Sequence, residues 1–89
     1  MEERYAIAAF RSRTQVLRLE ADARRVGIEG TVVNTPRAAA LGCGLSLKVA
    51  HKDLPALQKL IERNRYQTLI GLYSVDMSTG RARLQVYSH

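Results

Sequence analysis

The stretch Arg4-Tyr5-Ala6-Ile7-Ala8-Ala9-Phe10, followed by the polar residues Arg11-Ser12-Arg13-Thr14, begins the pattern that decides the fold. A short apolar run that ends in a polar tetrad predicts a strand and a turn. This strand and turn open an alternation of strands and helices that continues to the end of the chain.

Two helices are predicted from apolar residues that recur at helical spacing. Ser12 and Gln15 match a capping box at the start of the first repeat, and Gly27 follows its end. We therefore expect a helix over residues 13–26. A second repeat begins after an aspartate and carries a proline in its first turn, where no backbone donor is needed, which predicts a helix over residues 53–64.

Four further strands are predicted, over residues 31–33, 45–49, 68–75 and 81–87, from β-branched, alternating or apolar runs. The last two flank the polar, glycine-ended turn 76–80, which indicates a hairpin. The resulting order predicts an α+β fold of the ferredoxin-like split βαβ type (βαββαβ), with a C-terminal strand added as a hairpin.

The composition is that of one soluble globular domain spanning residues 1–89, with 46% hydrophobic and 25% charged residues. No apolar run approaches the roughly 18 to 20 residues of a membrane span, and the acidic start at Met1-Glu2-Glu3 lacks the organisation of a signal peptide. An unpaired cysteine fits a reducing compartment. We therefore expect a cytoplasmic protein without a membrane partner.

The net charge of +6, from 14 Lys and Arg against 8 Asp and Glu, favours anionic partners. A nucleic-acid partner is not favoured, because the sequence has no block of like charges and no tandem aromatic residues for stacking on bases. The edge strand over residues 81–87 predicts that two copies of the chain can pair as a homodimer.

Cys43 is the only cysteine, and it stands between Gly42 and Gly44 in the loop between the second and third predicted strands. Glycine neighbours carry no side chains to screen a sulfur, so one interpretation is a thiol presented to solvent. The other interpretation is a small buried apolar residue, which is what most free cysteines are. We expect partial solvent accessibility, and the spacing by itself leaves both interpretations open.

The predicted topology brings the turn at Arg11, Ser12 and Arg13, and the helix exit at Asn64-Arg65, to the same end of the sheet as the Cys43 loop. A helix N-terminus and nearby arginines stabilise a thiolate relative to a thiol. Residues 36–41, with three alanines, also fit a short helix whose C-terminal end would oppose the thiolate. The sequence leaves open which of these two opposing effects on the thiol is the stronger.

Other chemistry is not indicated. His51 and His89 are the only histidines, and they lack metal-ligand spacing, so no metal is predicted. His51 is also expected at the opposite end of the sheet from the Cys43 loop. The stretch Gly42-Cys43-Gly44 is not a phosphate-binding fingerprint, and we expect no cofactor.

The residues Thr35-Pro36-Arg37 and Gly42-Cys43-Gly44-Leu45-Ser46-Leu47 resemble the selenium/sulfur carrier-like family of small bacterial proteins, in a likeness that extends over residues 4–73. The resemblance implies a carrier that accepts sulfur or selenium on Cys43 as a persulfide or selenosulfide. It also implies that Gly42 and Gly44 form the setting of the thiol and that Arg37 accompanies it.

Such a carrier has two partners: a cysteine desulfurase or another sulfur or selenium donor, and an acceptor protein. Because the chain has no resolving thiol, release requires an outside nucleophile, and the protein is more a carrier than an enzyme with turnover of its own. The alternative is a basic ferredoxin-like module that binds protein or nucleic acid and holds Cys43 as a structural residue.

Overall fold

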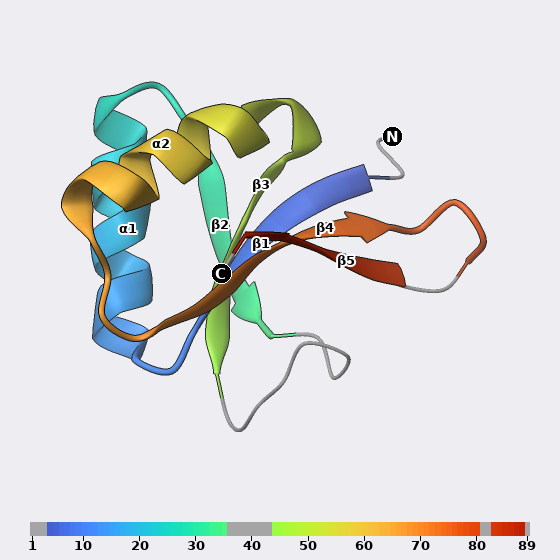
Figure 1. Cartoon of the computed structure of the whole chain (residues 1–89), viewed down its shortest axis with the longest axis horizontal. Coiled ribbons are helices and arrows are strands. Elements are labelled where there is room, and N and C mark those ends of the chain that lie inside the picture. Colours follow the sequence, from blue (N-terminus) through green and yellow to red (C-terminus); the bar gives the residue numbers. More distant parts are fainter. Residues whose placement is uncertain (1–3, 36–43, 81–82, 89) are drawn as a thin grey trace.

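The computed structural model describes residues 4–35, 44–80 and 83–88, and these form an α+β structure (Figure 1). Its strands and helices begin and end within two residues of the predicted limits. The strands are β1 (Arg4–Phe10), β2 (Gly30–Asn34), β3 (Leu45–Ala50), β4 (Leu69–Asp76) and β5 (Arg83–Ser88). The helices are α1 (Arg13–Arg25) and α2 (Leu54–Asn64), the latter preceded by a 3-10 turn at His51–Asp53.

All strand pairs in the described sheet are antiparallel, and the strand order is β2-β3-β1-β4-β5. Residues of both helices belong to one apolar cluster on a single face of the sheet (Figure 1). The predicted α+β class and the C-terminal hairpin are therefore confirmed, and the strand order is compatible with a ferredoxin-like fold.

Strand β1 is the centre of the sheet, paired with β3 on one side and β4 on the other. Its residues from Ala6 to Phe10 have no exposed surface. Both faces of this strand are thus covered, which explains why its sequence is a continuous apolar run rather than an alternating one. The alanines at positions 6 and 8 let the helices approach the sheet closely, while Phe10 fills the space at the end of the strand.

The main core lies between the sheet and the helices. The helices contribute residues three or four positions apart, which place one stripe of each helix against the sheet. These residues are Val16, Leu19 and Ala23 from α1 and Leu54, Leu57, Leu60 and Ile61 from α2. They pack on Ala6, Ala8, Phe10, Leu47, Val49 and Leu72 from the strands.

A second, smaller apolar cluster lies on the face of the sheet opposite the helices. It joins Ile7 and Ala9 of β1 to Tyr73 and Val75 of β4, and Leu84 of β5 packs against it. Cross-strand partners in register build this cluster, since Ile7 pairs with Tyr73 and Val75 pairs with Leu84. The C-terminal hairpin is thus anchored to the rest of the sheet by side chains as well as by the backbone.

The predicted capping box at the start of α1 is wrong, although the helix begins where it indicates. The Ser12 side chain makes no capping hydrogen bond. The Gln15 side chain instead accepts hydrogen bonds from the backbone N–H and the hydroxyl of Thr68, at 2.8 and 2.7 Å. A tertiary contact has replaced the local one, because the chain entering β4 carries donors of its own that Gln15 satisfies.

The C-terminal end of α1 follows the prediction at Gly27, which has a φ of +86°. Its N–H donates to the carbonyl of Arg24, and the N–H of Ile28 donates to the carbonyl of Ala23. This pair of bonds is a Schellman motif, which requires a left-handed residue and ends the helix sharply. Ile28 is buried immediately afterwards, so the motif also directs the chain into the core before β2.

Tyr66 ties the connection between α2 and β4 to α1. Its ring is buried edge-on against Phe10, and its hydroxyl donates a 2.5 Å hydrogen bond to Asp22. Asn64 donates to the same carboxylate, and the guanidinium of Arg18 lies 5.3 Å from the centre of the ring. Burial, and then the hydrogen bond to Asp22, raise the pKa of the Tyr66 hydroxyl above its ordinary value.

We expect Tyr66→Phe to lower the free energy of unfolding by about 1 to 2 kcal/mol at neutral pH, because a buried hydrogen bond to a carboxylate is lost. The folded-state pKa of Tyr66 exceeds the unfolded value of about 10, so this contribution is complete below pH 10 and is lost as the pH rises further. Chemical denaturation at several pH values should therefore show that the difference in free energy of unfolding between wild type and variant becomes smaller above pH 10.

The matched control is Tyr87→Phe, since Tyr87 lies on β5 with 43% of its surface exposed. We expect this substitution to change stability by less than about 0.5 kcal/mol. Equal losses in the two variants would contradict the assigned role of Tyr66.

Candidate functional site

Three of the predicted site residues, Cys43, Gly42 and Arg37, lie outside the described residues, as does the predicted short helix over 36–41. Their assigned roles, and the predicted accessibility of Cys43, remain predictions. The structure does describe Thr35 and Gly44, the residues that bound this segment on either side.

The base of the loop is closed by backbone and side-chain hydrogen bonds. Asn34 pairs with Leu45 at the end of the β2–β3 ladder, and the N–H of Thr35 donates to the carbonyl of Gly44 at 3.1 Å. The hydroxyls of Thr35 and Ser46 are 2.8 Å apart and hydrogen-bonded, and Ser46 is fully buried. The two ends of the loop are consequently held in hairpin register right up to the residue that precedes Pro36 and the one that follows Cys43.

Gly44 packs against the end of β1. A Cβ atom at this position would lie 2.6 Å from the carbonyl oxygen of Phe10 and 3.2 Å from the hydroxyl of Thr35. Real Cβ atoms do not come so close to a backbone oxygen, so glycine is required here for close approach. The sequence singled out Gly44 as a neighbour that leaves the thiol unscreened, and the structure adds this second, steric reason.

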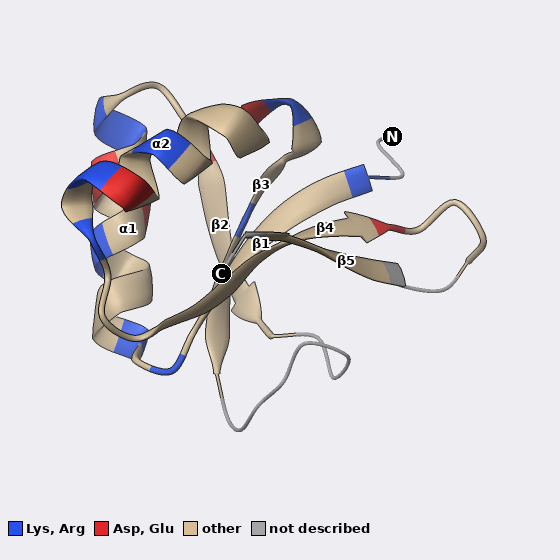
Figure 2. Cartoon of the chain, in the orientation of Figure 1, with Lys and Arg blue, Asp and Glu red and all other residues tan. Residues whose placement is uncertain are grey.

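This close contact places the turn at Arg11, Ser12 and Arg13 next to the loop base, since the turn begins immediately after Phe10. The N–H of Arg11 donates to the carbonyl of Thr68 at 2.9 Å, which fixes the turn against the entry to β4. The side chains of Arg11 and Arg13 are exposed, and neither forms an ion pair with a carboxylate among the described residues. Two cations with free donors therefore stand at the N-terminal end of α1 (Figure 2).

The expected neighbourhood is wrong for Asn64. Its side chain donates to Asp22, nine residues beyond the first residue of α1, so it lies beside the second half of that helix. After Asn64 the chain continues to the start of β4, where Thr68 forms hydrogen bonds with Arg11 and Gln15. The exit of α2 and the entry to β4 are therefore separate points, since the chain runs from beside Asp22 at Asn64 to beside Gln15 at Thr68.

His51 lies at the far end of β3 from Gly44, as the predicted topology requires. It follows Ala50, which pairs with Tyr5 near the start of β1. His89 is outside the described residues. Within the described ranges, no three His, Cys, Asp or Glu side chains gather in a way that could hold a metal ion.

Neither helix of the described structure combines the length and the apolar character that a membrane crossing needs.

The chain matches the model of a known protein family. The family model described as "Putative Se/S carrier protein-like" matches residues 5–71, which include Cys43 and both ends of its loop. The matched residues stop within β4, so β5 and the hairpin turn lie beyond them. No curated protein and no solved structure matches the chain.

We expect Gly44→Ala to destabilise the protein by about 1 to 3 kcal/mol, because a methyl group would collide with a backbone oxygen that β-sheet pairing holds in place. Gly71→Ala is the comparison. There the new methyl would meet the hydroxyl end of the Tyr73 ring at 2.9 Å, and a side chain can shift by a few tenths of an ångström more readily than a backbone carbonyl in the sheet. Urea denaturation should therefore show the larger loss for Gly44→Ala, and a larger loss for Gly71→Ala would contradict the steric account.

Proposed function

Because the chain belongs to the Se/S carrier protein-like family, we propose that it carries sulfur or selenium on Cys43 and passes it to a partner. The observation that carries this proposal is that the only thiol of the chain falls within the matched residues, between two glycines. We further propose that β1 to β4 and the two helices form a ferredoxin-like unit to which β5 is added, a view supported by the strand order.

The proposed chemistry is a thiol–persulfide exchange that takes place twice, first with the donor and then with the acceptor. The Cys43 thiolate attacks the outer sulfur of a persulfide on the donor, a new S–S bond forms, and the donor's own S–S bond breaks. The inner sulfur of the donor leaves as a thiolate with the electron pair, and the proton stays on the transferred sulfur. No outside oxidant is needed, and an acceptor thiolate removes the sulfur by the same exchange.

The described structure supports such a role in two ways. The closed base at Thr35 and Gly44 holds both ends of the Cys43 loop on a fixed support, so a partner meets the loop at a defined position. Arg11 and Arg13 bring positive charge to the adjoining end of α1, which favours an anionic sulfur nearby. We assign Gly42 and Arg37 to the immediate setting of the thiol, on the strength of the family resemblance.

A cysteine desulfurase is the proposed donor, because it presents sulfur as a cysteine-bound persulfide. The chain contains no second cysteine, so the loaded form cannot collapse to an internal disulfide and waits for an external acceptor. This property distinguishes a carrier from a reductase of the Cys-x-x-Cys type.

We expect incubation with a cysteine desulfurase and cysteine to add about 32 Da, the mass of one sulfur atom, to the wild-type chain. Cys43→Ser should abolish the gain while leaving the circular dichroism spectrum unchanged. Intact-protein mass spectrometry without reductant measures both. If the wild type gains no mass from the desulfurase or from a small persulfide donor, the carrier function is wrong.

A further inference from the structure

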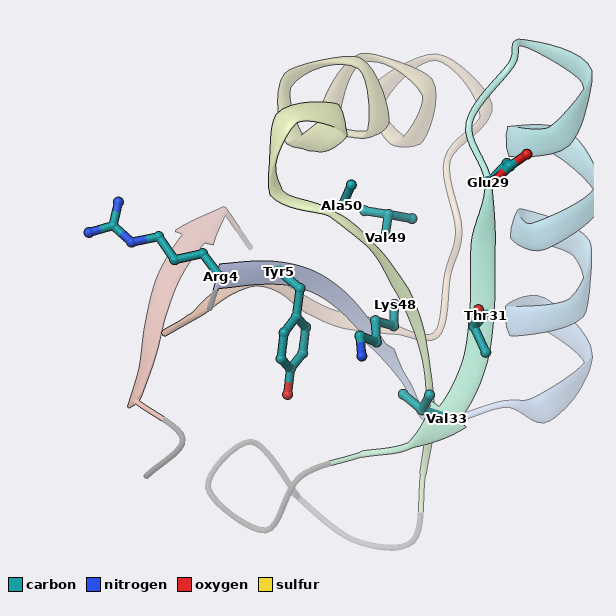
Figure 3. Close-up of a pocket in the computed structure, with 8 residues that line it drawn as sticks. All are labelled: Arg4, Tyr5, Glu29, Thr31, Val33, Lys48, Val49 and Ala50. Atoms are coloured by element: carbon teal, nitrogen blue, oxygen red, sulfur yellow. The ribbon is translucent and has the colours of Figure 1, made fainter. Parts of the chain in front are cut away.

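The face of the sheet opposite the helices carries a pocket of about 440 Å³ between β1, β3 and β2. Lys48 of β3 lies on its floor, the ring of Tyr5 on one side, and Thr31 and Val33 of β2 on the other (Figure 3). These side chains share a face because Lys48 pairs directly with both Ile7 and Thr31, and side chains directly opposite each other in a ladder project to the same side. We call this site the Lys48 pocket.

Two cations line the pocket: Arg4 is paired with the carboxylate of Asp76, and Lys48 is held against an aromatic ring. The ammonium of Lys48 lies 4.5 Å from the centre of the Tyr5 ring, a cation–π contact that restrains the flexible lysine side chain. Among the described residues no carboxylate is paired with it, so its donors are available to a ligand. Glu29 lies at the end of the pocket next to α1, well separated from Lys48 (Figure 3).

Lys48 lies away from most of the basic residues that the structure describes. Most Lys and Arg residues lie on the helices and the turns around them (Figure 2). Within β2, β3 and β4, Lys48 is the only lysine or arginine. Arg4 of β1, which also lines the pocket, pairs with Asp76, so Lys48 is the pocket cation that can offer its charge to a ligand.

The pocket also leads to the loop that bears Cys43. Val33 lies at its end nearest the loop and is two residues from Thr35, a separation of about 7 Å along an extended strand. Lys48 is four residues from Gly44, or about 13 Å. A ligand anchored on Lys48 and lying along β2 would therefore end beside the base of the loop.

We propose that the Lys48 pocket is the docking site for an acidic segment of the protein that delivers sulfur or selenium to Cys43. This inference rests on the proposed carrier function. A carboxylate of the segment pairs with Lys48, and the neighbouring apolar surface of Tyr5 and Val33 receives an adjoining side chain. The net charge of +6 favours encounter with an acidic partner, and the pocket fixes the orientation in which the partner's persulfide reaches the loop.

The test compares Lys48→Glu with Lys59→Glu. Lys59 is an exposed residue of α2, so the control makes the same change of net charge on the opposite side of the sheet. With a cysteine desulfurase and cysteine as donor, we expect Lys48→Glu to slow sulfur loading by about tenfold at low salt, and Lys59→Glu by less than twofold. The difference should shrink as salt is added, because the ion pair is partly exposed to solvent.

A small uncharged alkyl persulfide is the second donor, since it needs no docking site. Wild type, Lys48→Glu and Lys59→Glu should all accept sulfur from it at the same rate. This arm separates docking from the chemistry of Cys43, because a substitution that disturbs the thiol itself would slow both donors.

Each other outcome overturns the proposal. Equal slowing by the two lysine substitutions would mean that only net charge matters. Slowing of Lys48→Glu with the small persulfide would mean that Lys48 acts in the chemistry of Cys43 and not in docking.

If wild-type loading by the desulfurase slows as the carrier concentration rises, the pocket holds a second copy of the chain. If the wild type accepts sulfur from the small persulfide and not from the desulfurase, docking of that donor fails while the carrier function stands. If neither donor loads the wild type, the carrier function fails as well.

Discussion

The structure depends on a single strand that is buried on both faces and paired on both edges. β1 runs through the middle of the sheet, and none of its residues from Ala6 to Phe10 reaches solvent. Its backbone aligns β3 and β4, its even-numbered side chains receive both helices, and its odd-numbered ones organise the opposite cluster with Tyr73. A change of register by one residue would exchange these two faces, so the different sets of side chains on the two faces of β1 fix the register of the sheet.

The end of β1 is also where the candidate site begins. The carbonyl of Phe10 lies so close to Gly44 that only glycine fits, and the next residues along the chain are the exposed arginines of the turn into α1. The Cys43 loop is therefore supported by the most deeply buried element of the protein. Such an arrangement joins a rigid scaffold to a loop that carries function, which is how binding loops are commonly positioned. On the face of the sheet opposite the helices, the Lys48 pocket approaches the same loop from β2 and β3.

Most of the fold could be predicted from the sequence because its signals are local. The apolar run of β1, the helical repeat before Gly27 and the hairpin around Asp76–Gly80 each determine their own segment. Gln15 shows where local reasoning fails, because its side chain bonds to Thr68, 53 residues away, instead of capping its own helix. Asn64 lies away from the base of the Cys43 loop for a similar reason. The order of the strands predicts which ends of the elements lie together, but not the length of the connection from α2 to β4.

The candidate site was predictable only in part. The lone cysteine, its glycine neighbours and the family were recognisable from the sequence, and the family match confirms the last of these. The steric demand on Gly44 was not, because it arises from a carbonyl 34 residues earlier in the chain. The pocket around Lys48 was equally hidden, since its residues come from three strands and carry no motif in the sequence.

The most direct test of the carrier account is onward transfer of the sulfur. Wild-type protein is loaded with ³⁵S from labelled cysteine and a desulfurase, separated from the donor, and mixed with an acceptor thiol. The account predicts that one labelled sulfur per chain moves from Cys43 to the acceptor and that the protein returns to its original mass. Label that stays on the protein after exposure to the acceptor thiol, or that never becomes attached to Cys43, would contradict it.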